Sequence, residues 1–132
     1  MKKLSFIFLL LFSLSCSGNE NNPLIGTWVS DKDKSLQYSK SKNDLTWNQV
    51  QALEMILGKL RLKFTRDTTE SFYEKPVGNF GYKVLNQTDD YIEVEIASKD
   101  AKEKYKYYFD GEYIFLENDS DILPRDYFRR VE

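Results

Sequence analysis

Two carboxylates stand at a spacing that could support acid–base chemistry. Glu93 and Glu95 are separated by one residue, and on an extended strand such side chains lie about 6.5 to 7 Å apart on one face. Paired carboxyl groups at about this separation hydrolyse glycosidic bonds. However, Ile92, Val94 and Ile96 alternate with them, and such a strand normally turns its charged side to water. We therefore expect a solvated pair rather than a catalytic one.

A second acidic group, Asp119-Ser120-Asp121, resembles the beginning of a calcium-binding loop. Such a loop needs a glycine at its sixth position for a sharp turn and a glutamate at its last position as a bidentate ligand. No glycine stands at the sixth position here, and Arg130 occupies the last. We therefore expect a polar connection and no metal site.

Histidine is absent from the sequence. Its absence removes the most common general base and metal ligand, together with any serine or cysteine nucleophile that a histidine would activate. We therefore expect a protein that is not an enzyme, with no catalytic residues, no metal and no cofactor.

Residues 1–15 have the three parts of a secretory signal peptide. Lys2 and Lys3 precede an apolar stretch at residues 4–12, and a serine-rich exit follows at residues 13–15. A membrane-spanning helix needs about 20 apolar residues, and this stretch ends well before that length. We expect the segment to direct export and then to be removed.

Cys16, the only cysteine, follows this segment. The junction Ser15-Cys16 resembles a bacterial lipobox, in which the cysteine receives a diacylglyceryl group and becomes the new N-terminus. The resemblance implies acyl chains such as palmitate on Cys16, membrane lipid as a partner, and a place in the cell envelope. Ser17 at the next position implies the outer membrane if the cell is diderm. Lipidation also removes an unpaired thiol from an oxidising compartment; ordinary cleavage after Ser15 is the alternative.

Residues 16–23 and 24–132 differ in composition. The first segment carries polar residues, Gly and Pro without an apolar period, as expected of a lipidated N-terminus and a flexible tether. The second is long enough for one domain. Loss of Lys2 and Lys3 with the signal peptide lowers the 19 basic residues to 17, against 21 acidic ones. An acidic domain offers no broad electrostatic surface for nucleic acid, which we exclude as a partner.

Short segments of alternating apolar and polar residues run through the domain. Turn signals separate them, among them residues 76–78 and Asp110-Gly111, which suits a tight hairpin because glycine accepts a positive φ. Short strands at regular spacing are typical of a sandwich or a barrel, and short sequential connections favour the barrel. We predict a mainly β fold, an antiparallel up-and-down barrel of about eight strands, near residues 24–30, 60–64, 70–74, 80–86, 92–96, 105–109, 114–116 and 126–131.

One helix is predicted between the first two strands, at residues 46–57. Thr46 and Gln49 stand three residues apart, as in a capping box, and aliphatic residues follow at helical spacing. The preceding segment, residues 31–44, is rich in Lys and Ser and is predicted to be a polar loop.

The two ends of the domain carry a further pattern. Gly26-Thr27-Trp28 on the first strand resembles the G-x-W signature of lipocalins and of small bacterial lipocalin-like lipoproteins. The resemblance implies that Trp28 closes the floor of the barrel and that a basic residue from the last strand, Arg129 or Arg130, packs over it. It also implies a protein that binds a ligand, without identifying the ligand.

Two functions follow from this fold class. One is a lipid-anchored, non-catalytic domain that binds a small hydrophobic or aromatic ligand inside the barrel. The alternative is an envelope protein with a solid barrel that binds another protein, as an inhibitor or immunity protein does. Interior volume discriminates between them, because a ligand site needs a cavity of about a few hundred Å³.

The predicted helix bears on the ligand-binding hypothesis. An isolated helix of this length is marginal in water, so its apolar stripe must lie on something apolar. If the stripe covers the open end of the barrel, the helix is a lid or a plug, and Trp47, Val50 and Met55 border the ligand entrance. The alternative is a helix packed permanently as part of the core.

Overall fold

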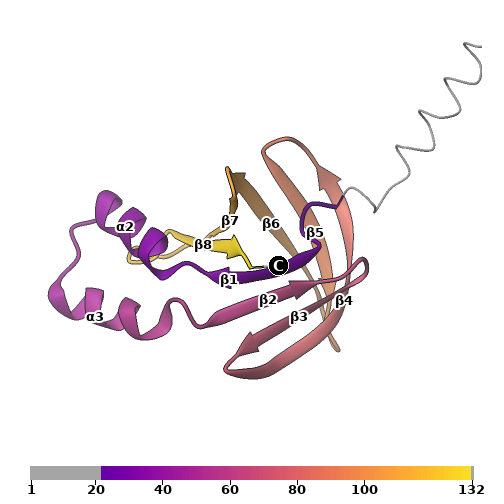
Figure 1. Ribbon diagram of the computed structural model, residues 1–132, viewed down its shortest axis with the longest axis horizontal. Helices are drawn as coiled ribbons and strands as arrows, with labels where there is room; N and C mark the ends of the chain where they lie inside the picture. The colour runs from indigo at the N-terminus through magenta and orange to yellow at the C-terminus, as the bar shows by residue number, and fades with distance from the viewer. Residues whose placement is uncertain (1–21, 132) are drawn as a thin grey trace, which may run out of the picture.

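The computed structural model describes residues 22–131. The predicted signal peptide at 1–15, Cys16 and the tether up to residue 21 lie outside the described residues, as does Glu132. Within 22–131, eight antiparallel strands close a barrel in chain order, and β8 pairs back to β1 (Figure 1). The strands are β1 (Gly26–Ser30), β2 (Leu60–Phe64), β3 (Thr68–Tyr73), β4 (Lys75–Gln87), β5 (Tyr91–Ala97), β6 (Lys102–Asp110), β7 (Tyr113–Glu117) and β8 (Arg125–Arg130).

The predicted up-and-down barrel is confirmed. Alternate residues of each strand turn inward, and they build one apolar core whose buried members include Leu62, Phe64, Ile92, Val94 and Phe128. Because a shift of one residue would turn these side chains to water, their alternation specifies the strand register.

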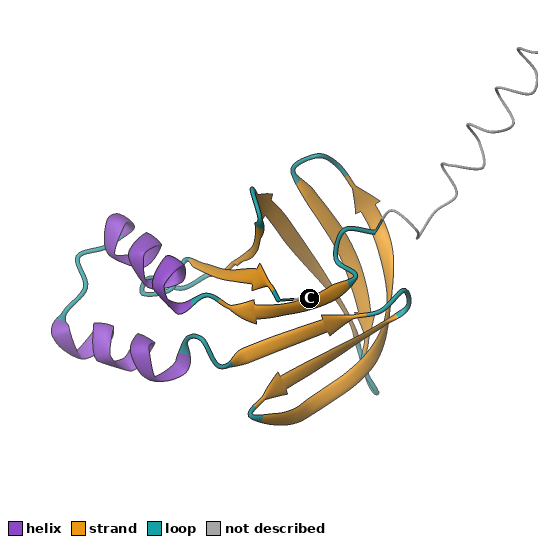
Figure 2. Ribbon diagram, viewed as in Figure 1, coloured by secondary structure: helices purple, strands orange, loops and turns teal. Residues whose placement is uncertain are grey.

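The barrel has two distinct ends. We call the end where β1 begins and β8 finishes the floor, and the opposite end, where β1 leads into the helices, the mouth. The helices α2 (Lys32–Lys42) and α3 (Trp47–Ile56) both lie between β1 and β2 and extend beyond the mouth end of these strands (Figure 2). Neither helix of the described chain is long and apolar enough to cross a membrane.

Helix α2 occupies the segment for which the sequence predicts a polar loop, and that prediction is wrong. Asp31 caps the helix, its side chain accepting a hydrogen bond of 3.0 Å from the Lys34 N–H. The side chains that α2 buries are Ser35, Leu36 and Ser39. Since two of these three are serines, the helix has no apolar stripe that periodicity could detect.

Contacts with the outside of the barrel hold α2 in place. The Ser35 Oγ accepts a buried hydrogen bond of 2.8 Å from the Tyr127 N–H of β8. The Tyr38 ring meets the Tyr127 ring edge-on at 5.8 Å. The Arg125 guanidinium lies 4.4 Å from the centre of the Tyr38 ring and 4.1 Å from that of Phe115. Tertiary contacts, rather than intrinsic amphipathicity, therefore stabilise this helix.

Helix α3 is confirmed, including its capping box. The Thr46 Oγ1 accepts from the Gln49 N–H at 3.2 Å, and the Gln49 Oε1 accepts from the Thr46 N–H at 2.9 Å. Leu53 and Leu57 are buried against Leu36 of α2, in a small cluster separate from the barrel core and bordered by Ile122 of the β7–β8 connection.

The β3–β4 turn differs from the predicted one at residues 76–78. The chain reverses at Glu74, which has a φ of 69°, and Pro76 lies inside β4. Proline is tolerated there because it pairs with Phe72 next to a register shift between Ser71 and Phe72, and a β-bulge relaxes the requirement for a ladder N–H.

Candidate functional site

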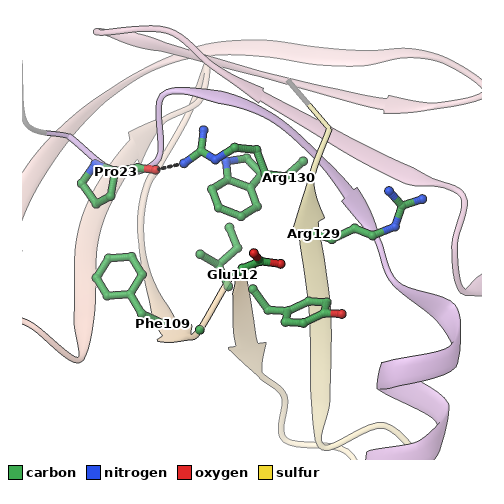
Figure 3. Close-up of a pocket in the computed structure, with 9 residues that line it drawn as sticks. Pro23, Phe109, Glu112, Arg129 and Arg130 are labelled. Atoms are coloured by element: carbon green, nitrogen blue, oxygen red, sulfur yellow. Dashed lines mark hydrogen bonds between the residues drawn. The ribbon is translucent and has the colours of Figure 1, made fainter.

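The floor of the barrel is closed around Trp28. Its indole is 4% exposed, and its Nε1–H donates to the Leu24 carbonyl at 2.9 Å. The Arg130 guanidinium lies over the indole at 4.3 Å and donates to the carbonyls of Ile25 and Pro23 at 2.7 and 2.6 Å (Figure 3). Arg130 is therefore the arginine that packs on Trp28.

Strand register explains why Arg130 rather than Arg129 has this role. Trp28 pairs with Arg130 across β1 and β8, and directly paired residues share a face of the sheet. Arg129 is on the opposite face and points away from the indole (Figure 3). Gly26, the glycine of the G-x-W pattern, has a φ of 135°, a conformation that residues with a Cβ rarely adopt.

Two residues that the sequence assigns to the flexible tether pack at the floor. The Asn22 side chain is buried; its Nδ2 donates to the Tyr82 hydroxyl at 2.9 Å and its Oδ1 accepts from the Leu24 N–H at 2.9 Å. The Pro23 carbonyl accepts from Arg130. The folded domain therefore includes Asn22 and Pro23, because the floor uses their polar groups.

A hollow of about 570 Å³ borders this closure, lined by residues that include Trp28, Phe109, Glu112 and Arg130 (Figure 3). The guanidinium in it already holds two carbonyls and the indole. A ligand that recruited this group would open the floor. We therefore regard the hollow as part of the structural closure.

Large side chains pack together in the floor half of the barrel interior. The Phe64 ring packs edge-on against the rings of Tyr82 at 5.6 Å and Tyr107 at 5.5 Å. Ile92 and Val94 are 0% exposed beside them. These large side chains from β2, β4, β5 and β6 fill the space between the strands.

The mouth half contains a cavity of about 380 Å³. Most of its wall is apolar or aromatic, while β3 contributes only the small side chains of Thr69 and Ser71. Interiors of eight-stranded barrels are just wide enough for side chains to fill them, so two small residues on one strand leave space. The cavity is lined by Leu60, Leu62, Thr69, Ser71, Phe80, Ile96, Ser98, Glu103, Tyr105, Tyr107, Leu116 and Phe128.

Tyr107 is the most deeply buried polar side chain of this lining. It is 4% exposed, and burial raises the pKa of its hydroxyl above the ordinary tyrosine value. The Tyr107 side chain forms part of the cavity wall. A tyrosine hydroxyl both donates and accepts hydrogen bonds, so it offers a ligand in the cavity a hydrogen-bonding partner.

Glu103 and Tyr105 form the polar part of the cavity wall. The Tyr105 hydroxyl donates to the Glu103 Oε2 at 2.5 Å. This hydrogen bond is the main reason that the pKa of Tyr105 is raised, and burial adds to it. Among the described residues that line the cavity, Glu103 is the one with a formal charge.

The three residues predicted to border a ligand entrance lie away from this cavity. Val50 packs on the cluster between α2 and α3, whereas Trp47 and Met55 are 74% and 70% exposed. None of the three lines the cavity. The apolar stripe of α3 finds its partners in α2 and the β7–β8 connection, so this helix matches the alternative of a packed element rather than a lid.

The acidic residues Glu93, Glu95 and Asp119 lie away from the cavity. Glu95 pairs with Lys104 and Glu93 with Lys106 across β5 and β6, and the Glu95 carboxylate lies 3.6 Å from the Lys83 ammonium. Asp119 is exposed in the β7–β8 connection. Within residues 22–131, no three acidic, cysteine or histidine side chains gather at a metal-binding distance.

Comparisons of the chain with protein families, with curated proteins and with solved structures found no match. The geometry of the barrel is therefore the basis for inferring its function. The cavity residues were missed in the sequence because alternation marks Tyr105 and Tyr107 as inward but does not tell which inward positions border a void. The one available signal was the pair of small inward residues on β3.

Proposed function

We propose that this protein is a non-catalytic binding module that takes a small apolar or aromatic ligand into the mouth of its barrel. The observation that carries the proposal is the cavity of about 380 Å³. Ligand sites are typically concave, mostly apolar, about 300 to 1,000 Å³ in volume, and furnished with a few polar groups. Leu60, Ile96 and Leu116 supply apolar wall here, and the Tyr107 hydroxyl supplies a buried polar group.

The cavity volume bounds the size of the ligand. An apolar protein cavity of about 150 Å³ binds benzene, and the volume of about 380 Å³ here is roughly two and a half times as large. A molecule with two fused or linked aromatic rings, or a chain of comparable volume, is the expected size. A full-length phospholipid tail pair would not fit.

The same proposal places the domain at a membrane of the cell envelope, the outer membrane in a diderm cell, through acyl chains on Cys16. Its support is the sequence pattern of residues 1–17. Two or more acyl chains give stable anchoring, since each buried CH₂ contributes about 0.8 kcal/mol. In this arrangement the barrel would hold its ligand close to a membrane surface.

A fluorescent neutral probe, N-phenyl-1-naphthylamine, tests the cavity. We expect its emission to rise on mixing with the protein and the rise to saturate at one probe per chain. Ser71→Leu places a larger side chain in the cavity and should abolish the rise in emission. Glu70→Leu introduces the same side chain on the outer face of β3 and should leave the rise unchanged. Unchanged binding by Ser71→Leu, with both variants folded by circular dichroism, would contradict the proposed site.

A second function has one observation in its favour. On α3, the side chains of Trp47, Met55 and Ile56 are 74%, 70% and 52% exposed, and exposed apolar patches often mark protein interfaces. An inhibitor or immunity-type protein would use such a face. If mass spectrometry of the protein purified from its own cells finds no retained small molecule, and the probe does not bind, protein binding is supported over small-ligand binding.

A further inference from the structure

The charge of the cavity is set by one side chain. Glu103 projects into the cavity from β6, in the row of inward residues that includes Tyr105 and Tyr107. Its carboxylate is exposed at the mouth and is fixed by the hydrogen bond from the Tyr105 hydroxyl. The site therefore holds an anion at its rim and neutral side chains in its interior.

No cation of the described cavity lining offsets this carboxylate. The neighbouring Lys102 and Lys104 belong to the same strand, but alternation turns them to the outer face, where Lys104 pairs with Glu95. The ion pairs within residues 22–131 use Lys34, Lys59 and Lys83 and leave Glu103 without a partner within 4.0 Å. The rim carboxylate is therefore available to a ligand.

Aromatic rings border the same rim. Phe80 is 38% exposed and lines the cavity together with Tyr105. Aromatic faces attract cations, so these rings and the Glu103 carboxylate favour the same sign of charge. A carboxylate ligand, such as a fatty acid, would meet a like charge and find no cationic side chain to pair with.

We propose that the cavity selects amphipathic amines, holding a protonated amino group at Glu103 and an apolar or aromatic body between Leu60, Ile96 and Leu116. A hydrogen-bonding group at the far end of that body would reach Tyr107. This inference rests on the proposed function, because it names the class of ligand that the same cavity takes.

Three probes with one aromatic body separate the charge preference from binding itself. They are 1-naphthylmethylamine, 1-naphthalenemethanol and 1-naphthaleneacetate, titrated into the full-length protein by isothermal titration calorimetry at pH 7. We expect the amine to bind about fivefold more tightly than the alcohol, the upper end for an accessible ion pair, and the acetate to bind most weakly. The preference for the amine should shrink as salt screens the rim charge.

Variants assign the preference to Glu103. Glu103→Gln keeps the size of the side chain and should make the affinities for amine and alcohol equal. Glu93→Gln removes the same charge from the outer face of β5 and should preserve the preference. Binding of the alcohol without preference for the amine, or an amine preference that survives Glu103→Gln, would overturn this inference alone. Failure of all three probes to bind would overturn the ligand-binding function with it.

Discussion

Asp126 provides a test of how the barrel treats a half-buried charge. It lies on β8 next to β1, at the mouth end, and its Oδ1 accepts a hydrogen bond of 3.4 Å from the Ser30 hydroxyl. Burial raises the pKa of Asp126 to about 6, and the hydrogen bond from Ser30 opposes that rise. The Ser30 oxygen also accepts from the Gly58 N–H at 3.1 Å. The Ser30 hydroxyl therefore links β1 to β8 and to the segment that leads into β2.

Proton linkage determines how the raised pKa of Asp126 makes the free energy of unfolding depend on pH. The pKa of an aspartate in the unfolded chain is about 3.9, so between about pH 4 and pH 6 the folded state binds the proton more tightly. The stabilisation from the bound proton is fully present below about pH 4, and it is lost as the pH rises through about 6. A pKa difference of about 2 corresponds to about 3 kcal/mol at about 1.36 kcal/mol per unit.

Asp126→Asn removes the charge and keeps an oxygen that accepts from Ser30. We expect the variant to be more stable than the wild type by up to about 3 kcal/mol at pH 8, and to differ little at pH 4, where Asp126 itself is protonated. Urea unfolding followed by circular dichroism at both pH values measures the difference. Asp119→Asn, which removes an exposed carboxylate from the preceding connection, should show no such dependence on pH.

Two outcomes would refute this reasoning. If Asp126→Asn changes the free energy of unfolding equally at pH 4 and pH 8, then Asp126 is not a buried ionising group. If the variant is less stable than the wild type at pH 8, then the carboxylate is stabilised by its surroundings rather than penalised by burial.

Three further predictions concern the floor, the anchor and α3. Trp28→Ala should lower the free energy of unfolding by about 3 to 5 kcal/mol, the range for a buried aromatic residue, and a loss below about 1 kcal/mol in urea titration would show that the floor does not depend on the indole. Cys16→Ala should abolish palmitate labelling and release a folded domain from the membrane fraction; a variant that stays membrane-bound, with a wild type that takes up no label, argues against lipidation. Amide hydrogen exchange in α3 should not change when N-phenyl-1-naphthylamine is added, because α3 does not line the cavity, whereas protection gained there would restore the lid hypothesis.

The sequence alone determined the elements whose signals are local. Alternation of apolar and polar residues defined the strands, because successive side chains of a strand point to opposite faces of the sheet. The Thr46 and Gln49 pair marked the start of α3, because a capping box is satisfied within a single turn. The G-x-W pattern directed attention to Trp28 and to two arginines, but strand register was needed to choose Arg130.

Only the tertiary structure decided the features that depend on distant partners. Helix α2 has no apolar stripe, and it is held by Ser35 and Tyr38 against a strand about 90 residues later in the chain. The cavity exists because Thr69 and Ser71 are too small to meet the side chains across the barrel. The volume left inside depends on the inward side chains of several strands together, so the sequence of one strand does not reveal it. Burial likewise comes from the closed barrel, and it gives Asp126 its raised pKa. Local patterns specify which face of a strand turns inward, whereas packing between strands determines what space remains inside.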